Sequence, residues 1–291
     1  MAKQIMNRIS DTAQFIAFNR ALGTLAPQVP GFSDPVARLL LPDKWARKVE
    51  QAEAGRAKVP PRSPFPFWLR GMGLFNQFRT VVLDRAIDSA LPVPQLVILG
   101  AGLDGRAWRM TGLNATSVFE VDHPDTQAWK RERSSRLQLA AGAIRFVPAD
   151  LRTDVLAARL AEAGHDSRRP SFWLCEGVAM YLALEEVVRL LAGTAALAGA
   201  GSRLALTYLG KRNGRMPASL LHPFLDMAGE PVRSAFAPAE LAAATEAAGW
   251  RTVADSGIED WKRELAPTLA LTENQVGLQW SERIWVGQKS G

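Results

Sequence analysis

The chain has 291 residues, of which 47% are hydrophobic and 22% charged, a composition that excludes extensive disorder and suffices for one large α/β domain. Its formal net charge of +6 allows an anionic partner, such as a carboxylate substrate, an acidic carrier protein or nucleic acid, without choosing among them. The single cysteine, Cys175, excludes an internal disulfide and favours a reducing compartment.

The N-terminal stretch has no signal-peptide pattern, because Asn7, Arg8 and Asp11 interrupt its apolar residues. No apolar run reaches the roughly 18 residues that a membrane span needs. We therefore expect a cytoplasmic protein that does not cross a membrane.

Residues 1–94 have a helical pattern. Apolar residues recur at helical spacing in three early segments and in one later segment that ends before Pro92. The predicted helices are Thr12–Leu25, Pro35–Leu41, Asp43–Ala57 and Leu74–Leu91. Between them, Val59–Phe67 holds four prolines and is predicted to be an ordered loop or hinge.

From Gln95 onward, strand-like and helix-like segments alternate, which predicts an α/β fold with a doubly wound, mostly parallel sheet and a ligand at the carboxyl ends of its strands. The predicted strands are Leu96–Leu99, Ser117–Val121, Ala143–Val147, Ser171–Cys175 and Ser202–Tyr208. The predicted helices between them are Thr126–Ala141, Thr153–Ala163 and Leu184–Leu197.

An insertion of about residues 210–235, rich in proline, follows the fifth strand and is placed to cover a substrate. A helix at Pro238–Ala248 and strands at Trp250–Ala254 and Arg283–Gly287 complete the prediction. We expect a helical N-terminal cap, 1–94, and a ligand-binding core, 95–291, in one structural unit.

The first predicted strand runs into Gly100, Gly102 and Gly105, a G-x-G-x-x-G pattern. Without a Cβ atom, glycine adopts positive φ, and a ligand can lie against the bare backbone at a helix N-terminus. Glu120 and Asp122 follow about twenty residues later at the end of the second strand, where doubly wound folds bind a ribose. The pattern predicts a nucleoside cofactor and leaves open whether it is a dinucleotide or S-adenosyl-L-methionine (SAM).

Five motifs in order along the chain resemble the leucine carboxyl methyltransferase family, in particular its bacterial SAM-dependent branch. They are F-x-D-P-x-A at Phe32–Ala37, V-I-L-G-A-G-L-D-G-R at Val97–Arg106, V-F-E-V-D-H-P at Val118–Pro124, A-D-L-R at Ala149–Arg152 and L-C-E-G-V-x-M-Y-L at Leu174–Leu182. The segment Gly229–Leu241 fits the family as well.

The resemblance implies a class I methyltransferase fold, with a seven-stranded sheet whose last strand is antiparallel and a helical segment that closes over the cofactor. It implies SAM as cofactor and S-adenosyl-L-homocysteine (SAH) as product. It places Arg79 on the cofactor carboxylate and Glu176 at the methionine end. Along the methionine and ribose it places Gly100, Ala101 and Gly102, and on the ribose hydroxyls Asp122, with Glu120 assisting or pointing into the sheet. At the adenine it places Asp150 and Leu151.

Two positions depart from the family pattern. Gly105 stands where relatives usually carry threonine, and Leu206–Leu209 lacks the acidic residue often found at the end of that strand. Both departures bear on the substrate more than on the cofactor.

The predicted function is SAM-dependent O-methylation of a carboxylate or phenolic hydroxyl on a small molecule, such as a polyketide-type secondary metabolite. Tyr181 is expected near the reacting groups, and His222, in the insertion, is a candidate base or substrate contact. Cys175 is expected to be an inert core thiol, and no histidine or cysteine spacing predicts a metal. A protein C-terminal carboxyl methyltransferase and an NAD-dependent oxidoreductase are the alternatives, and we expect neither a nucleic-acid nor a membrane partner.

Overall fold

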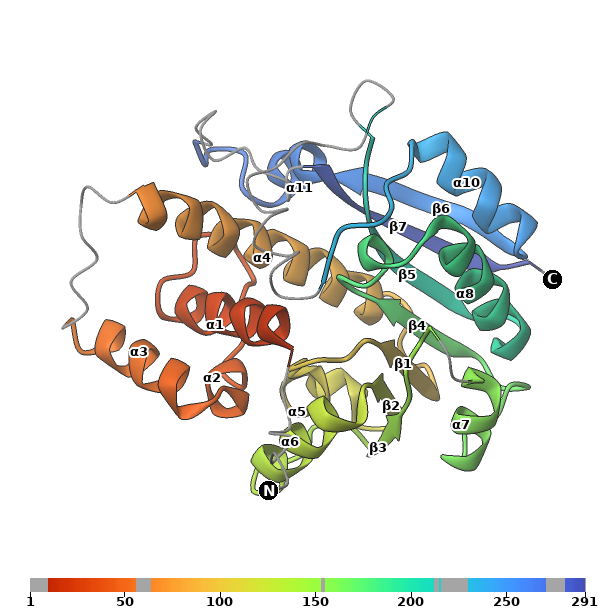
Figure 1. Cartoon of the computed structure of the whole chain (residues 1–291), viewed down its shortest axis with the longest axis horizontal. Helices are drawn as coiled ribbons and strands as arrows, with labels where there is room; N and C mark the ends of the chain where they lie inside the picture. Colours follow the sequence, from red (N-terminus) through yellow and green to blue (C-terminus); the bar gives the residue numbers. More distant parts are fainter. Residues whose placement is uncertain are drawn as a thin grey trace, which may run out of the picture.

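The computed structural model describes residues 10–55, 64–152, 155–211, 215, 230–270 and 281–290. Its centre is a seven-stranded sheet in the order β3-β2-β1-β4-β5-β7-β6 (Figure 1). The strands are β1 Gln95–Leu99, β2 Ser117–Asp122, β3 Ala143–Pro148, β4 Ser171–Cys175, β5 Arg203–Leu209, β6 Trp250–Gly257 and β7 Glu282–Lys289. Neighbours from β3 to β5 pair in parallel, whereas β7 is antiparallel to both β5 and β6. The predicted sheet, with its antiparallel last strand, is confirmed.

Helices cover both faces of this sheet. Successive residues of β1 point to opposite faces, so that Leu96 and Ile98 belong to one hydrophobic cluster and Val97 and Leu99 to another. The first cluster packs on α1 (Asp11–Leu25), α4 (Pro64–Asp88) and α11 (Ile258–Leu265), and the second on α7 (Leu156–Glu162), α8 (Leu184–Leu197) and α10 (Pro238–Ala247). A strand buried on both faces requires the unbroken apolar run seen in the sequence.

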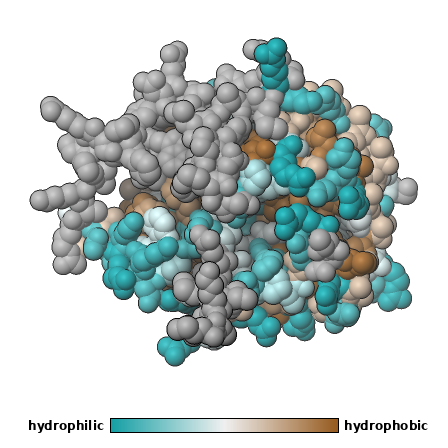
Figure 2. Space-filling view, in the orientation of Figure 1, coloured by the Kyte–Doolittle hydropathy of each residue, from teal (hydrophilic) through white to brown (hydrophobic). Residues whose placement is uncertain are grey.

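Of the remaining helices, α2 (Ala37–Leu40) and α3 (Asp43–Glu53) lie beside α1, whereas α5 (Arg106–Arg109) follows β1 and α6 (Pro124–Ser134) follows β2 (Figure 1). Short 3-10 turns are η1 (Thr111–Leu113) and η2 (Ala179–Tyr181). Figure 2 shows hydrophilic residues over the region of α3 and more hydrophobic ones toward the alanine-rich helices α8 and α10. Within the residues described, none of these helices is both long and apolar enough to span a lipid bilayer.

The prediction of a loop over Val59–Phe67 is wrong from Pro64 onward, because α4 already begins there. Proline lacks only a backbone N–H, and the first turn of a helix leaves its N–H groups unpaired, so Pro64 and Pro66 fit where they stand. Residues 56–63 lie outside the described part of the chain.

Other helices end several residues before their predicted ends, and one α-helix was not predicted. The helices predicted to reach Ala57 and Ala141 end at Glu53 and Ser134. Helix α11 was missed, although its buried Ile258, Trp261 and Leu265 have helical spacing. Most of the predicted insertion, including His222, lies outside the described residues, and the division of the chain into cap and core stays a prediction.

Candidate functional site

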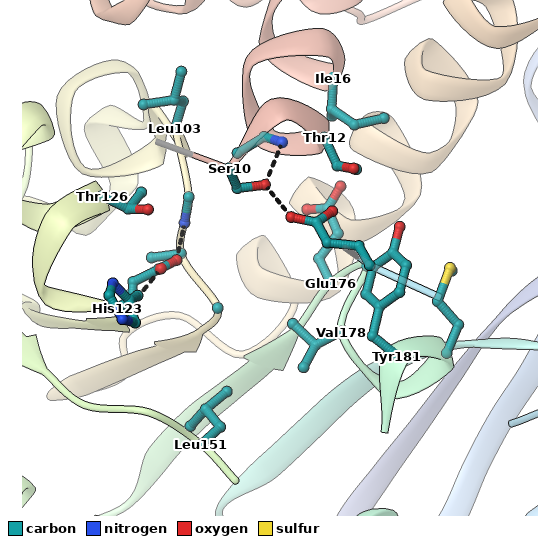
Figure 3. A pocket seen from close by; sticks show the side chains of 18 of the residues that line it. Ser10, Thr12, Ile16, Leu103, His123, Thr126, Leu151, Glu176, Val178 and Tyr181 are labelled. Carbon is teal, nitrogen blue, oxygen red and sulfur yellow. Dashed lines mark hydrogen bonds between the residues drawn. The ribbon is translucent and has the colours of Figure 1, made fainter. Parts of the chain in front are cut away.

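A cavity of about 790 Å³ opens at the carboxyl ends of β1, β2 and β4, and its volume is in the range of small-molecule sites. All but one of the site residues predicted from the sequence line it. They are Arg79, Gly100, Ala101, Gly102, Asp122, Asp150, Leu151, Glu176 and Tyr181. Figure 3 shows Thr12, Glu176 and Tyr181 on one side of this cavity and His123 and Leu151 on the other. The structure therefore brings together residues from positions 79 to 181, while His222 is not among those described.

The turn after β1 has the backbone that the glycines predict. Gly100 and Gly102 both have positive φ, of 63° and 44°. A Cβ at Gly100 would collide with Val178, and one at Gly102 would lie 3.2 Å from the Cβ of Ala13 in α1. Bare backbone here thus also lets the N-terminal helix and the segment after β4 approach the turn. The helix that follows, α5, is four residues long.

Asp122, at the tip of β2, is held by two backbone donors. Its Oδ2 accepts a hydrogen bond from the Gly102 N–H at 2.5 Å, and its Oδ1 accepts one from the His123 N–H at 2.6 Å. Burial raises the pKa of the Asp122 carboxyl, and these two hydrogen bonds oppose that increase. The carboxylate is fixed in orientation beside the glycine turn before any ligand binds.

Glu120, two residues earlier, does not line the cavity and instead points into the protein. It is fully buried, and its Oε2 lies 2.6 Å from the Nζ of Lys130 in α6. Burial raises the pKa of this carboxyl to about 7, against the opposing charge of Lys130. Of the two acids that end β2, only Asp122 lines the cavity.

The buried Glu120 predicts a pH-dependent stability. Because the pKa is about 7 in the folded protein and 4.5 is its ordinary value, the folded state binds the proton more tightly. The free energy of unfolding therefore falls as the pH rises between those values. Glu120→Gln removes this loss. The stability of the variant relative to the wild type should therefore rise by up to roughly 3 kcal/mol from about pH 5 to pH 8, in addition to the cost of leaving the buried Lys130 without its partner.

Urea denaturation of both proteins at the two pH values measures this change. Glu162→Gln, in an exposed position of α7, is the matched control and should show no such change. An equal stability difference between Glu120→Gln and the wild type at both pH values would contradict the prediction.

Asp150 and Leu151 follow β3 and line the far side of the cavity. The carboxylate of Asp150 accepts hydrogen bonds from the side chain of Arg152 at 3.1 and 3.2 Å, which lower the pKa of Asp150. Leu151 contributes an apolar side chain next to this ion pair. The pair is half-exposed and can exchange with a ligand at little cost.

Arg79, in α4, meets two carboxylates at the opposite end of the cavity. Its Nε lies 2.9 Å from Glu176, which follows β4, and its Nη1 donates to both oxygens of Glu282 at 3.0 and 3.1 Å. All three residues line the cavity and are nearly buried. Glu282 was not predicted from the sequence, because it comes from β7, more than a hundred residues beyond Glu176.

Arg79 and its two carboxylates belong to a longer chain of buried ion pairs. Arg106 contacts three carboxylates, those of Asp84 at 2.7 Å, Glu176 at 2.8 Å and Asp104. Arg109 joins Asp84 at 2.6 Å to Asp34, which also pairs with Arg20 at 2.8 Å. Charged residues from six parts of the sequence, at positions 20, 34, 79–84, 104–109, 176 and 282, thus form one network. Arg79 and Glu176, which the motifs suggest as ligand contacts, thus also form buried ion pairs that link the elements around the site.

Tyr181, in η2, faces the N-terminus of α1. Burial raises the pKa of its hydroxyl, and the neighbouring Glu230 and Glu282 raise it further. Ser10 caps α1 by accepting from the Ala13 N–H at 3.0 Å and donates a hydrogen bond to Glu230 at 2.7 Å (Figure 3). Ser10 and Glu230 were not predicted as site residues, although Ser10 precedes a helix and Glu230 lies in the Gly229–Leu241 motif.

Cys175 lies in the buried strand β4, where burial raises the pKa of its thiol to about 12. A thiol that stays protonated is a poor nucleophile. This environment agrees with the predicted inert core thiol.

Comparisons with known proteins match the chain to methyltransferases. The sequence profile of the family described as leucine carboxyl methyltransferase matches residues 13–195. A protein from Frankia alni described as an S-adenosyl-L-methionine-dependent methyltransferase is 37% identical over 202 residues, which are 69% of this chain and 68% of the relative. A protein of the same description from Mycobacterium avium is 34% identical over 213 residues, 71% of this chain and 66% of the relative.

Solved structures share the fold at low sequence identity. A protein from Streptomyces avermitilis of the DUF574 family has a TM-score of 0.60 at 12% identity, with 97% of this chain and 98% of that chain covered. A protein from Thermobifida fusca described as a methyltransferase has a TM-score of 0.58 at 15% identity, with 99% and 97% covered. Both similarities concern the fold alone.

Proposed function

Because the chain belongs to the leucine carboxyl methyltransferase family and is a SAM-dependent methyltransferase, we propose that it methylates an oxygen of a small molecule, either a carboxylate or a phenolic hydroxyl. The choice of oxygen rests on the family, whose described activity is methylation of a carboxyl group, and the single observation that favours a small molecule is the apolar wall of the cavity next to Tyr181. The cofactor itself, S-adenosyl-L-methionine, follows from the family and its relatives.

The residues around the cavity fit this cofactor. A glycine turn without side chains lies beside a fixed carboxylate, Asp122, which suits a ribose diol. At the other end Arg79 suits a carboxylate, and Glu176 suits an ammonium group. We propose that Leu151 packs on the adenine and that Asp150 accepts from its exocyclic amine, after exchange of its pair with Arg152.

Apolar side chains beyond the methionine end form a wall suited to the body of an acceptor. Two come from α1, one from α4, one from η2 and one from the end of β5, and all of them line the cavity. They are Phe15, Ile16, Met72, Met180 and Leu209. Apolar walls with a few polar groups are typical of sites for small organic molecules. This wall favours a small acceptor with an apolar body over a long polar peptide.

When bound, SAM supplies a methyl group that is already electrophilic, so the protein contributes mainly orientation. The Tyr181 hydroxyl, like that of any tyrosine with an ordinary or raised pKa, is protonated at neutral pH, so that it can donate a hydrogen bond to an acceptor oxygen. A carboxylate acceptor is ionised at neutral pH and needs no base. For a phenolic acceptor we propose His222, outside the described residues, as the base.

The proposed function is tested by incubating the protein with SAM and a panel of aromatic carboxylates and phenols, followed by mass spectrometry. We expect a methyl ester or a methyl ether that Asp122→Ala does not produce. Methylation of nitrogen or sulfur alone, or of a protein C-terminal carboxylate alone, contradicts the proposal. The second outcome would instead support the protein-directed alternative.

Tyr181→Phe is expected to lower kcat roughly tenfold on an accepted substrate, because it removes one oriented hydrogen bond worth about 1 kcal/mol or slightly more. The KM for SAM should change little, because the proposed hydrogen bond of this hydroxyl is to the acceptor and not to the cofactor. Steady-state kinetics with both substrates varied separates these effects. The other tyrosine, Tyr208, donates its hydroxyl to Asp255 at 2.6 Å away from the cavity, so Tyr208→Phe is the matched control and should keep kcat. Equal losses of kcat in both variants count against a role at the acceptor.

A further inference from the structure

Glu230 is a carboxylate on the side of the cavity that we assign to the acceptor. It lines the cavity, and hydrogen bonds fix the segment that carries it to η2. The backbone N–H groups of Arg233 and Ser234 donate to the carbonyl of Met180 at 2.7 and 3.3 Å. The Ser234 hydroxyl also donates to the carbonyl of Ala179 at 2.9 Å. Since Met180 belongs to the apolar wall, this segment is held against the place of the acceptor body.

Among the residues that the structure describes, no cation pairs with Glu230. Its hydrogen-bond partner is the hydroxyl of Ser10, at 2.7 Å (Figure 3). By contrast, each of the four arginines that line the cavity already has a carboxylate partner. The pairs are Arg20–Asp34 at 2.8 Å, Arg79–Glu176 at 2.9 Å, Arg152–Asp150 at 3.1 Å and Arg233–Glu186 at 3.0 Å. The cavity therefore offers an unpaired carboxylate at this place, whereas its arginines are engaged.

The Tyr181 hydroxyl lies close to this carboxylate. Burial, and after it the charge of Glu230, raises the pKa of Tyr181, and Glu282 acts in the same direction while Arg79 opposes it. An acceptor oxygen at Tyr181 thus lies near two carboxylates and one arginine, which is itself shared between Glu176 and Glu282. The negative charge of an ionised carboxylate acceptor would be repelled there. A hydroxyl acceptor can instead donate a hydrogen bond to a carboxylate.

We infer that Glu230 selects a hydroxyl acceptor over a carboxylate, because it accepts a hydrogen bond from the acceptor hydroxyl and takes its proton during methyl transfer. The acceptor oxygen forms the new bond to the methyl carbon, sulfur keeps the electron pair of the broken S–CH₃ bond, and the O–H proton moves to Glu230. A carboxylate suffices as the base, since the hydroxyl becomes strongly acidic as its oxygen bonds to the methyl group. Glu230 is thereby the first acceptor of the proton, ahead of His222. This role rests on the proposed function and decides between its two acceptor classes.

The test compares pairs of probes that share an apolar body and differ in the acceptor group, such as 4-butylphenol and 4-butylbenzoate, within the panel of phenols and carboxylates described above. We expect the wild type to have the higher kcat/KM for the phenol of each pair. Glu230→Gln keeps the shape of the side chain and should lower kcat for the phenol roughly a hundredfold, without lowering it for the carboxylate. Its affinity for SAH, measured by isothermal titration calorimetry, should stay that of the wild type. Glu185→Gln, exposed in the first turn of α8, is the matched control and should change neither quantity.

Two outcomes overturn the role of Glu230 while the proposed function stands. The first is a wild type that prefers the carboxylates, and the second is a Glu230→Gln protein that keeps its turnover of phenols. If Glu230→Gln weakens SAH binding as strongly as it lowers phenol turnover, Glu230 holds the cofactor instead. If the wild type methylates no oxygen in the whole panel, the proposed function itself fails. Should circular dichroism find Glu230→Gln unfolded, the preference of the wild type within each pair still decides.

Discussion

Asp122→Ala is expected to weaken the binding of SAM and SAH roughly a hundredfold or more. Two hydrogen bonds to a charged acceptor contribute on the order of 1.5 to 3 kcal/mol each. The Asp122 carboxylate can make them without reorganisation, because the N–H groups of Gly102 and His123 already fix it. Its loss therefore removes both the acceptor and its fixed orientation.

Isothermal titration calorimetry with SAH measures this effect directly. Asp125→Ala, three residues further on in the first turn of α6, is the matched control and should alter the affinity by less than about twofold. Thermal unfolding of both variants separates a loss of binding from a loss of folding. If a folded Asp122→Ala protein binds SAH as tightly as the wild type, Asp122 does not hold the ribose.

Arg106→Met is expected to lower the free energy of unfolding by about 3 to 5 kcal/mol, which corresponds to a decrease in Tm on the order of 10 °C. The Arg106 guanidinium is 3% exposed and contacts Asp84, Asp104 and Glu176. Methionine fills a similar volume but leaves these buried carboxylates short of a cation. Leaving charges buried and unpaired costs more than the ion pairs themselves contribute.

Urea denaturation compares this variant with Arg85→Met, in which an exposed arginine of α4 loses its contact to the exposed Glu264 at 2.8 Å. A surface pair contributes at most about 1 kcal/mol, so the control should stay close to the wild type. Similar losses in the two variants would show that the buried network adds nothing beyond an ordinary ion pair.

The sequence predicts the centre of the fold well, because burial on both faces leaves a clear signal. Strand β4 and helix α8 have the predicted bounds, and β1 differs by one residue. The glycine turn and the acid at the tip of β2 are also found where the spacing placed them. These features depend on residues close together in the chain.

Glu282 could not be found in this way. Its place beside Leu209 depends on the antiparallel register of two strands separated by more than seventy residues. The missing acid at the end of β5 was noticed in the sequence, but no local pattern indicates that another strand carries an acid to the same edge. The start of α4 differs from the prediction for another reason, because the first turn of a helix tolerates the prolines that would break its interior.

The network of arginines and carboxylates also restricts how related sequences can diverge. Arg109 is shared between Asp34 and Asp84, and Arg79 between Glu176 and Glu282. Replacing one of these residues by a neutral one leaves its partners buried without a counter-charge. A tolerated change therefore has to substitute two or more of these positions at once. We expect these sites to covary among homologues, with the acid of the last strand appearing or vanishing together with the arginine that faces it.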